Sequence, residues 1–308
     1  MILCTGEALI DMLPRETAAG EAAFAPHAGG AVFNTAIALG RLGAPVGFFS
    51  GVSTDLFGRL LEEVLQASRV DCSLLARSDR PTTLAFVTLR NGQASYAFYD
   101  EGTAGRMLGR ADLPSLPSRI TTLFFGGISL VSEPCGSAYE ALMLREAPAR
   151  VTMIDPNIRP GFIRDEAAYR ARIGRMMAVA DIVKLSDEDL RWLSGGDGIE
   201  AGARTVLEGG ARLVLVTEGA AGAHGFTKDG SVFVPARKVE VADTVGAGDT
   251  FNAGVLASLD RAGRLSKAAL SRLTEADVGA ALDLGVRAAA VTVSRPGANP
   301  PWAAEIAA

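Results

Sequence analysis

Short apolar runs alternate along this chain with longer stretches of helical periodicity, and this alternation restricts the possible folds more than any other feature. The apolar runs are candidate strands at residues 2–5, 46–50, 122–126, 151–154, 182–185 and 213–217. Candidate helices lie between or after them, at residues 32–42, 55–67, 165–179, 199–208, 247–262 and 275–290. This order predicts βα units and therefore an α/β fold with a mostly parallel sheet.

One segment interrupts the alternation. Residues 82–89 and 94–99 flank an Asn-Gly pair and have the pattern of a β-hairpin, and the second arm, ASYAFY, is rich in aromatic residues. A hairpin inserted into such a chain is either an extension of the sheet edge or a small lid, and spacing leaves both open. No linker, low-complexity segment or internal repeat divides the 308 residues, so we expect a single domain over residues 1–308.

Composition excludes several classes of protein. With 48% hydrophobic and 21% charged residues, the chain can bury a packed core. A net charge of −5 without a lysine or arginine run argues against nucleic acid or an anionic membrane as partner. Cys4, Cys72 and Cys135 are far apart and His27 and His224 are the only histidines, which predicts reduced thiols and no histidine-rich metal site. With no basic leader and no apolar run of membrane-spanning length, we expect a soluble, cytoplasmic protein.

The segment DTVGAGDTFNAG, residues 243–254, has the properties of an anion site. Gly246, Ala247 and Gly248 precede a candidate helix, so their backbone N–H groups and the positive end of the helix dipole meet at one point. Asp249 then lies in the first turn, where it could accept a proton from an incoming hydroxyl, or simply cap the helix. The phosphate-binding patterns GxxxxGK[ST] and GxGxxG are absent here, which disfavours a simple P-loop or dinucleotide-binding enzyme.

Two further segments are weaker signals. In AGGAVFNTAIALGRLG, residues 28–43, a glycine pair precedes a helix with Asn34 in its first turn, where its amide could bind a polyol or satisfy local backbone. Asp11 follows the first strand, and open α/β sheets gather ligand residues at the carboxyl ends of strands. VTEGAAGAHGF, residues 216–226, is a strand followed by a glycine turn, which suits a nucleotide and suits a hairpin equally well.

Taken together, these segments resemble one family. AGGAVFNTAIALGRLG and DTVGAGDTFNAG resemble the two signature segments of the ribokinase-like (PfkB-type) carbohydrate kinases, and GEALIDMLP, the hairpin, KLSDED, VTEGAAG and SRPGANPPW extend the resemblance over nearly the whole chain. GEALID, GGA and RPTTLAFVTL are most similar to fructokinases within it. The resemblance implies a three-layer αβα fold with a mostly parallel central sheet and a small β lid, formed by roughly residues 8–25 and 80–102.

That resemblance also implies roles for individual residues. Asp249 matches the catalytic base, and the matches to the anion hole are Gly246, Ala247 and Gly248. The residues implied for the sugar are Asp11, Gly29, Gly30 and Asn34, together with Tyr96 and Phe98 of the hairpin. Those implied for the nucleotide are Lys184, Ser186, Thr217, Gly219 and Gly222, with Gly248 shared.

The chain departs from the family pattern at the motif Asn-x-x-Glu, where it has Ser186 and Asp189. The resemblance implies that Asp189 acts on Mg²⁺ through water, and the alternative is a solvated residue in the first turn of a helix. Arg159, in DPNIRPGF, matches an arginine that reaches substrate or phosphate in some relatives, and the alternative is a surface salt bridge.

A monovalent-cation site is also implied by the resemblance. Asp243 matches its carboxylate, and the carbonyls that would complete it belong to Val245, Thr292, Arg295 and Gly297. Pro301 replaces a hydroxyl residue found in some potassium-activated relatives, so activation by K⁺ stays open.

The activity implied is transfer of the γ-phosphoryl group of ATP, with Mg²⁺, to a sugar hydroxyl. Fructose is the first expectation, with 2-keto-3-deoxygluconate or ribose as alternatives; Ala31 lacks the charge typical of ribokinases after the glycine pair, which counts against ribose. The alternative from another class is a sugar- or nucleotide-binding protein without catalysis. The implied partners are small molecules and a second copy of the chain, joined through the lid.

Overall fold

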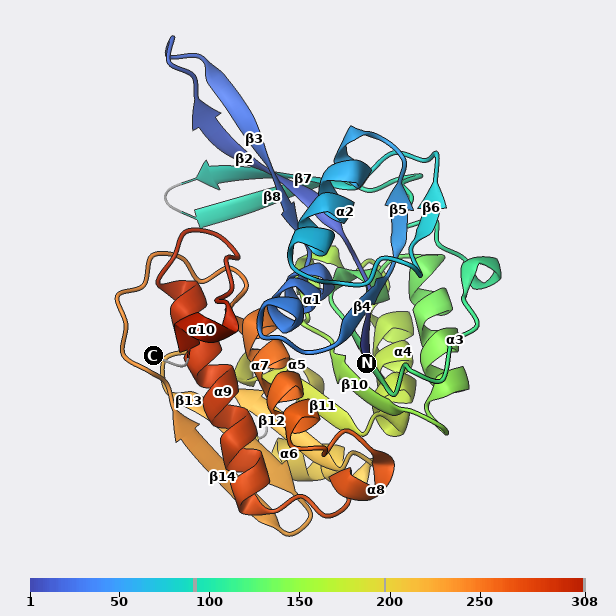
Figure 1. The fold of residues 1–308 in the computed structure, drawn as a ribbon, viewed down its shortest axis with the longest axis vertical. Coiled ribbons are helices and arrows are strands. Elements are labelled where there is room, and N and C mark those ends of the chain that lie inside the picture. Colours follow the sequence, from blue (N-terminus) through green and yellow to red (C-terminus); the bar gives the residue numbers. More distant parts are fainter. Residues whose placement is uncertain (91–92, 197, 307–308) are drawn as a thin grey trace.

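The central element is an eight-stranded sheet with the order β14-β13-β12-β11-β10-β9-β1-β4 (Figure 1). The structure is a computed structural model that describes residues 1–90, 93–196 and 198–306, without the side chains of residues 88–90 and 93–96. The strands of the sheet are β1 (Ile2–Thr5), β4 (Val46–Phe49), β9 (Thr122–Gly126), β10 (Val151–Asp155), β11 (Ile182–Ser186), β12 (Leu213–Thr217), β13 (Gly222–Thr227) and β14 (Gly230–Pro235). All pairs from β4 to β12 are parallel, whereas β13 and β14 are antiparallel, so the mostly parallel sheet is confirmed.

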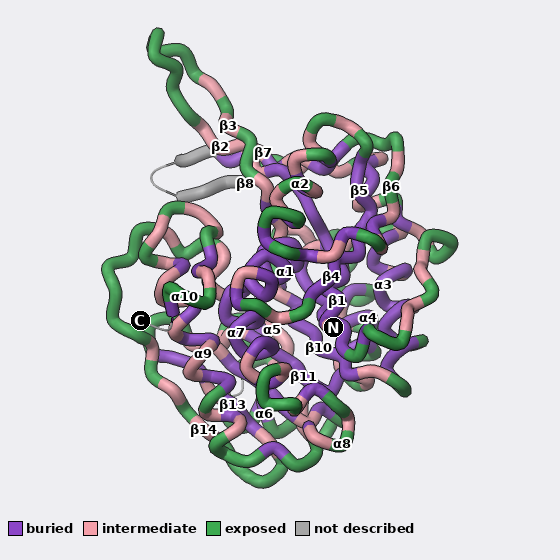
Figure 2. Tube along the Cα trace, viewed as in Figure 1, coloured by how far each residue is buried: buried purple, intermediate pink, exposed green. Residues whose placement is uncertain are grey.

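Both faces of this sheet are buried, which explains why its strands read as continuous apolar runs. In β1, Ile2 and Cys4 belong to the core on one face, and Leu3 belongs to the core on the other. The parallel strands of the sheet are buried along nearly their whole length in Figure 2, whereas the edge strand β14 is largely exposed. Successive side chains of a strand point to opposite faces, so two cores of different helices form on one sheet.

The helices make the two outer layers of a three-layer αβα fold. One layer packs on the first core and consists of α1 (Ala31–Arg41), α2 (Leu56–Ala67), α7 (Ala247–Arg261) and α9 (Glu275–Val293). The other packs on the second core and consists of α3 (Cys135–Glu146), α4 (Glu166–Val179), α5 (Asp187–Ser194) and α6 (Ile199–Glu208). The short helices are α8 (Lys267–Leu270), α10 (Ala303–Ile306), η1 (Arg110–Asp112), η2 (Ile128–Leu130) and η3 (Pro160–Phe162). Within the described residues, no helix combines the length and apolarity needed to cross a membrane.

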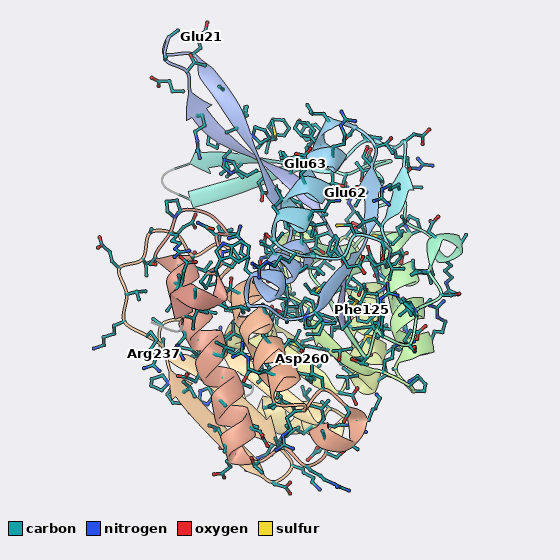
Figure 3. All side chains as sticks on the ribbon, viewed as in Figure 1. Glu21, Glu62, Glu63, Phe125, Arg237 and Asp260 are labelled. Carbon is teal, nitrogen blue, oxygen red and sulfur yellow. The ribbon has the colours of Figure 1, made fainter. Side chains whose placement is uncertain are left out.

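A separate four-stranded sheet lies above the carboxyl ends of the central strands. Its order is β3-β2-β7-β8, with β2 (Leu9–Glu16), β3 (Ala22–Gly29), β7 (Leu84–Arg90) and β8 (Gln93–Tyr99), and β5 (Gly51–Ser53) pairs separately with β6 (Ala76–Ser78). The predicted hairpin is confirmed by the antiparallel pairing of β7 with β8, and its Asn-Gly turn lies outside the described residues. The β2–β3 hairpin extends away from the rest of the molecule, with Glu21 near its tip (Figure 3).

Candidate active site

A cavity of about 760 Å³ opens at the carboxyl ends of the parallel strands, where ligands of open α/β sheets bind. It lies between the four-stranded sheet and the N-termini of α1 and α7. The predicted site residues that line it are Asp11, Gly30, Asn34, Phe98, Arg159, Lys184, Ser186, Asp189, Thr217, Gly219, Val245, Gly246, Ala247, Gly248 and Asp249. Residues from segments far apart in the chain therefore meet in one place.

The glycine turn has the geometry of an anion site. Gly246 is the N-cap of α7 and has φ of 78°, a conformation that favours glycine. A Cβ on Gly246 would lie 2.8 Å from the Cβ of Ala298, so the turn also packs too tightly for a side chain. The N–H of Ala247 donates to the carbonyl of Thr244 at 3.4 Å, and the turn lines the cavity at the positive end of the α7 dipole.

Asp249 lies in that first turn and is 8% exposed. Its Oδ2 accepts a hydrogen bond from Nδ2 of Asn34 at 2.9 Å, which fixes the carboxylate against α1. Burial raises the pKa of Asp249 to about 7, with the charges of Asp155 and Glu7 in the same direction and Asn34 and Lys184 opposing. A carboxylate with such a pKa accepts a proton near neutral pH, as a general base requires. Helix capping alone is therefore a poor description of this residue.

The acceptor side of the cavity is formed around Asp11 of β2. A Cβ on Gly29 would lie 2.4 Å from Oδ2 of Asp11, so the glycine leaves room for that carboxylate. Burial raises the pKa of Asp11 to about 6. Gly30 has φ of 111° and precedes α1, which carries Asn34. A carboxylate and an amide in one polar wall suit the hydroxyl groups of a sugar.

The far wall of the acceptor side is aromatic and basic. Phe98 of β8 contacts Phe162 edge-on, with ring centroids 4.7 Å apart. Arg159 lines the cavity, donates to the carbonyl of Ile158 at 3.0 Å and forms no ion pair among the described residues, so the alternative of a surface salt bridge is wrong. The side chain of Tyr96, the other predicted aromatic residue, lies outside the described part of the chain.

Lys184 places a positive charge beside the glycine turn. Its Nζ lies 3.4 Å from the position of a Cβ on Gly248 and 3.0 Å from Oδ2 of Asp155. Nδ2 of Asn252 donates to the same oxygen at 2.7 Å, so a buried network holds the lysine beside the turn. A charge held in this way needs little rearrangement to stabilise a phosphate.

An apolar cavity of about 520 Å³ adjoins the first one and shares Thr217, Gly219 and Gly248 with it. Its other walls include Gly222, the predicted nucleotide residue that does not line the first cavity, and the side chains of Phe251, Val241, Val286 and Val293. Apolar walls beside an anion site suit a nucleoside base whose phosphates reach the glycine turn. Residues 216–226 form the hairpin that the sequence left open as an alternative, since β12 pairs antiparallel with β13.

Ser186 and Asp189 form a capping box at the start of α5. The N–H of Asp189 donates to Oγ of Ser186 at 2.9 Å, and the N–H of Ser186 donates to Oδ2 of Asp189 at 3.0 Å. Oδ1 of Asp189 accepts the N–H of Ile158 at 2.8 Å. The residue lies in the first turn of α5, as the alternative predicted, but it is 4% exposed, so it is not solvated. In the described chain, no cluster of three or more His, Cys, Asp or Glu side chains is arranged to hold a metal ion.

Asp243 ties two loops together near the glycine turn. Its Oδ1 accepts the N–H of Val245 at 3.0 Å and its Oδ2 accepts the N–H of Gly297 at 2.9 Å. The carbonyl of Thr292 accepts the N–H of Arg295 at 3.1 Å. The folded chain therefore brings the predicted cation ligands close together. That they bind a cation stays a prediction.

Sequence reasoning missed three polar side chains of the site. Glu7 lines the cavity beside Asn34, while Asp155 and Asn252 hold Lys184. Glu7 lies just after β1, which ends at Thr5, and Asp155 is the last residue of β10. A position at the carboxyl end of a parallel strand was the signal that could have identified both as site residues.

An anion turn at a helix N-terminus, a buried base beside it, and a polar and an apolar cavity on either side define a phosphotransferase of the ribokinase-like fold. The sequence model of the pfkB family carbohydrate kinases matches residues 1–305, and the chain belongs to this family. It is accordingly a carbohydrate kinase, an enzyme that transfers a phosphoryl group to an alcohol.

Individual relatives agree with that assignment. A fructokinase from Rhizobium leguminosarum bv. trifolii is 59% identical over 275 residues, covering 89% of this chain and 84% of the relative. The structure of a Xylella fastidiosa fructokinase with bound ATP has a TM-score of 0.88 at 29% identity, covering 99% of this chain and 96% of that one. A fructokinase double mutant from Vibrio cholerae O395, with fructose, ADP and potassium bound, has a TM-score of 0.84 at 28% identity, covering 96% and 93%.

Proposed function

We propose that this carbohydrate kinase phosphorylates fructose with ATP as the donor. The observation that carries the proposal is the 59% identity over 275 residues to the Rhizobium fructokinase. The polar cavity wall at Asp11 and Asn34 supports a polyol acceptor, and the apolar cavity beyond Thr217 supports a nucleotide donor.

In the proposed mechanism Asp249 removes the proton of a sugar hydroxyl bound between Asp11 and Asn34. The oxygen attacks the γ-phosphorus in line, the bond from that phosphorus to the bridging oxygen breaks, and ADP leaves with the electron pair. The hydrogen bond from Asn34 orients the carboxylate toward the acceptor side. General-base catalysis of this kind contributes about 10²–10⁴ in rate.

Negative charge on the transferred group is stabilised by the backbone N–H groups of residues 246–248 and by Lys184. Both are fixed before the reaction, the amides by the helix and the lysine by Asp155 and Asn252. Charge stabilisation by groups that need not reorganise is a large part of catalysis in phosphoryl transfer.

Mg²⁺ fits the donor set next to this turn. Proteins bind it through one or two carboxylates plus substrate phosphates and waters, so a large cluster of acidic residues is not required. Asp189 would hold one of its waters, since each oxygen of that carboxylate accepts a single backbone N–H and keeps further acceptor capacity. When bound with ATP, the ion offsets phosphate charge.

For a monovalent cation we propose the Asp243 loop, with carbonyls of Val245, Thr292, Arg295 and Gly297. The support is that Asp243 already bridges residues 245 and 297, and that the Vibrio relative was crystallised with potassium. Bound there, K⁺ would stabilise the loop that leads into the glycine turn.

The four-stranded sheet is proposed to be the lid of a single kinase domain over residues 1–308, formed by roughly residues 8–25 and 80–102. Phe98 supports this role, because it lies over the acceptor cavity from β8. On the opposite face, Phe24 contacts Phe86 with ring centroids 5.0 Å apart, and Phe86 contacts Tyr99 at 5.4 Å. Phe24 and Tyr99 are 43% and 63% exposed, so this aromatic row supports a homodimer in which two lids pack together.

The proposed acceptor is tested by ADP release from Mg-ATP with fructose, 2-keto-3-deoxygluconate, ribose, glucose and adenosine, each with potassium and with sodium. We expect the highest kcat/KM with fructose and a further increase with potassium. A higher kcat/KM with another acceptor contradicts fructose as the substrate. Binding of fructose and ATP without ADP release contradicts catalysis and leaves a binding protein.

A further inference from the structure

Glu7 is a buried carboxylate in the wall of the acceptor cavity that the proposed mechanism does not use. It follows β1 and is 9% exposed. It lies in the same cavity as Asn34 and Asp249. A charged group is costly to bury, so its surroundings must compensate for it.

That compensation comes from two loops that form opposite parts of the cavity wall. Oε1 of Glu7 accepts the N–H of Ala31, the first residue of α1, at 2.9 Å. Oε2 accepts the N–H of Ser129, in the turn after β9, at 3.2 Å. One side chain thus joins the helix that carries Asn34 to the turn that carries Ile128, and both residues line the cavity.

Two glycines are required by this arrangement. Gly127 has φ of 70°, and a Cβ there would lie 2.0 Å from Oε1 of Glu7. Gly30 has φ of 111°, and a Cβ there would lie 2.9 Å from the carbonyl oxygen of Glu7. Both loops therefore pack directly on Glu7, and their separation depends on its length.

The charge of Glu7 also acts on Asp249. The charged groups facing Asp249 are Asp155 and Glu7, which raise its pKa, and Lys184, which lowers it. Burial raises the pKa of Glu7, while its hydrogen bonds from Ser129 and Ala31 lower it. The neighbours of Glu7 on α3 are the thiol of Cys135 and the hydroxyl of Tyr139, and burial raises the pKa of each of these two groups, so neither is an ion at neutral pH.

We propose that Glu7 is a positioning residue of the acceptor site, which sets the distance between residues 30–31 and residues 127–129 and places a second carboxylate in the cavity that holds Asp249. The inference rests on the proposed function, because it takes Asp249 as the base and this cavity as the sugar site. It assigns to one residue an effect on sugar affinity and an effect on proton transfer, and these can be separated.

The experiment compares Glu7→Gln, Glu7→Asp and the control Glu146→Gln over pH 5.5 to 9, with kcat/KM and the two KM values measured at each pH. Glu146 is 8% exposed, pairs with Arg150 and lies outside the cavity, so its variant loses a buried charge without touching the site. Melting temperatures with and without ATP report whether each variant is folded.

For Glu7→Gln we expect the acid limb of kcat/KM to move to lower pH, because a like charge in the same cavity as Asp249 is removed. The KM for sugar rises about tenfold, because one backbone N–H faces an amide donor, and the KM for ATP is unchanged. Glu7→Asp keeps the charge but is one methylene shorter, so its acid limb stays in place while its sugar KM rises. Glu146→Gln keeps the wild-type limb and both KM values.

A Glu7→Gln enzyme with the wild-type acid limb overturns the electrostatic part of the proposal, and a wild-type sugar KM in both Glu7 variants overturns the positioning part. If Glu7→Gln does not fold, Glu7→Asp alone decides the positioning part. Wild-type enzyme without turnover on any sugar contradicts the proposed function, whereas normal wild-type turnover with unaltered Glu7 variants contradicts this inference alone.

Discussion

Asp249 combines three properties that an isolated aspartate on a helix does not have: burial, an oriented carboxylate and neighbouring negative charge. Burial removes solvent that would stabilise the anion, and the neighbouring negative charge adds repulsion. The orientation of the carboxylate depends on Asn34, a residue 215 positions earlier in the chain. The basicity of this residue is therefore a property of the folded molecule.

Replacement of Asp249 by asparagine is expected to lower kcat by about 10²–10⁴, the range typical of general-base catalysis. Binding of ATP, measured by calorimetry, is expected to persist because the helix N-terminus is unchanged. Asp260→Asn is a matched control near the other end of the same helix α7, outside the cavity lining, and should keep wild-type turnover. Turnover of Asp249→Asn within tenfold of wild type would contradict the assignment of the base.

The raised pKa of Asp249 has a consequence for stability as a function of pH. Its pKa rises from 3.8 to about 7 on folding, so between these values the folded state binds more protons than the unfolded state. The stabilisation from this group is complete below pH 4 and is lost as pH rises through 7. Asparagine cannot ionise, so from pH 5 to pH 8 Asp249→Asn should gain stability relative to wild type, at about 1.4 kcal/mol for each pH unit up to about pH 7. Urea denaturation of the wild type and of Asp249→Asn at pH 5 and at pH 8 measures the difference in their free energies of unfolding. The same difference at both pH values contradicts the raised pKa.

At the scale of elements, helix α7 carries the reaction at its first turn, and the two ends of the helix can be compared directly. Gly246 before it and Gly263 after it both have positive φ, of 78° and 66°. A Cβ on Gly246 would lie 2.8 Å from Ala298, whereas nothing lies within 4 Å of one on Gly263. The two positions therefore share backbone strain and differ in packing and in their place relative to the cavity.

We expect Gly263→Ala to cost about 1 kcal/mol of unfolding free energy and to retain activity, because the strain falls at the far end of the helix. Gly246→Ala should cost more, because the loop around Ala298 must also move, and should lower kcat at least tenfold by displacing the amides. Urea denaturation and steady-state kinetics on both variants test the comparison. Equal kcat in the two would argue against a role of this turn in catalysis.

The sequence predicts elements well where local pattern and final environment agree. Apolar runs that are buried on two faces and amphipathic helices both give clear patterns in the sequence. For this reason the prediction was correct within a few residues for the parallel strands of the central sheet and for helices α1, α2, α4, α6, α7 and α9. Strand β13 was missed because Gly225 replaces a strand-forming residue where α9 packs closely; a Cβ there would lie 2.5 Å from Val278. Helix α5 was missed because Ser186 and Asp189 were interpreted as a site motif, although they also form a capping box.

For the site, the positions of the anion turn and of Asn34 could be predicted from their segments, but not their contact. The hydrogen bond between Asn34 and Asp249 requires α1 to pack on α7, which only the tertiary structure reveals. The same holds for Glu7, whose two acceptor atoms bind N–H groups of Ala31 and Ser129, 24 and 122 residues away. Local sequence contains no information on such distant pairings.

At the scale of the whole molecule, the aromatic row of the four-stranded sheet is the surface proposed for dimer formation. We expect a dimer by sedimentation velocity at micromolar concentration and a monomer for Phe24→Glu, because a charge in the centre of an apolar contact is unpaired. Phe233→Glu is the control, since Phe233 is 47% exposed on β14, outside that sheet. A monomeric wild-type protein, or a dimer that persists in Phe24→Glu, contradicts an interface through the lid.

The hydrogen bond between Asn34 and Asp249 joins residues that are synthesised at very different times. The residues proposed to bind the acceptor, Asp11 and Asn34, leave the ribosome before α7, which carries Asp249 215 residues after Asn34. The acceptor residues are therefore synthesised before the base and the anion turn. In the proposed mechanism, phosphoryl transfer requires α7, so a chain truncated before α7 cannot transfer phosphate from ATP.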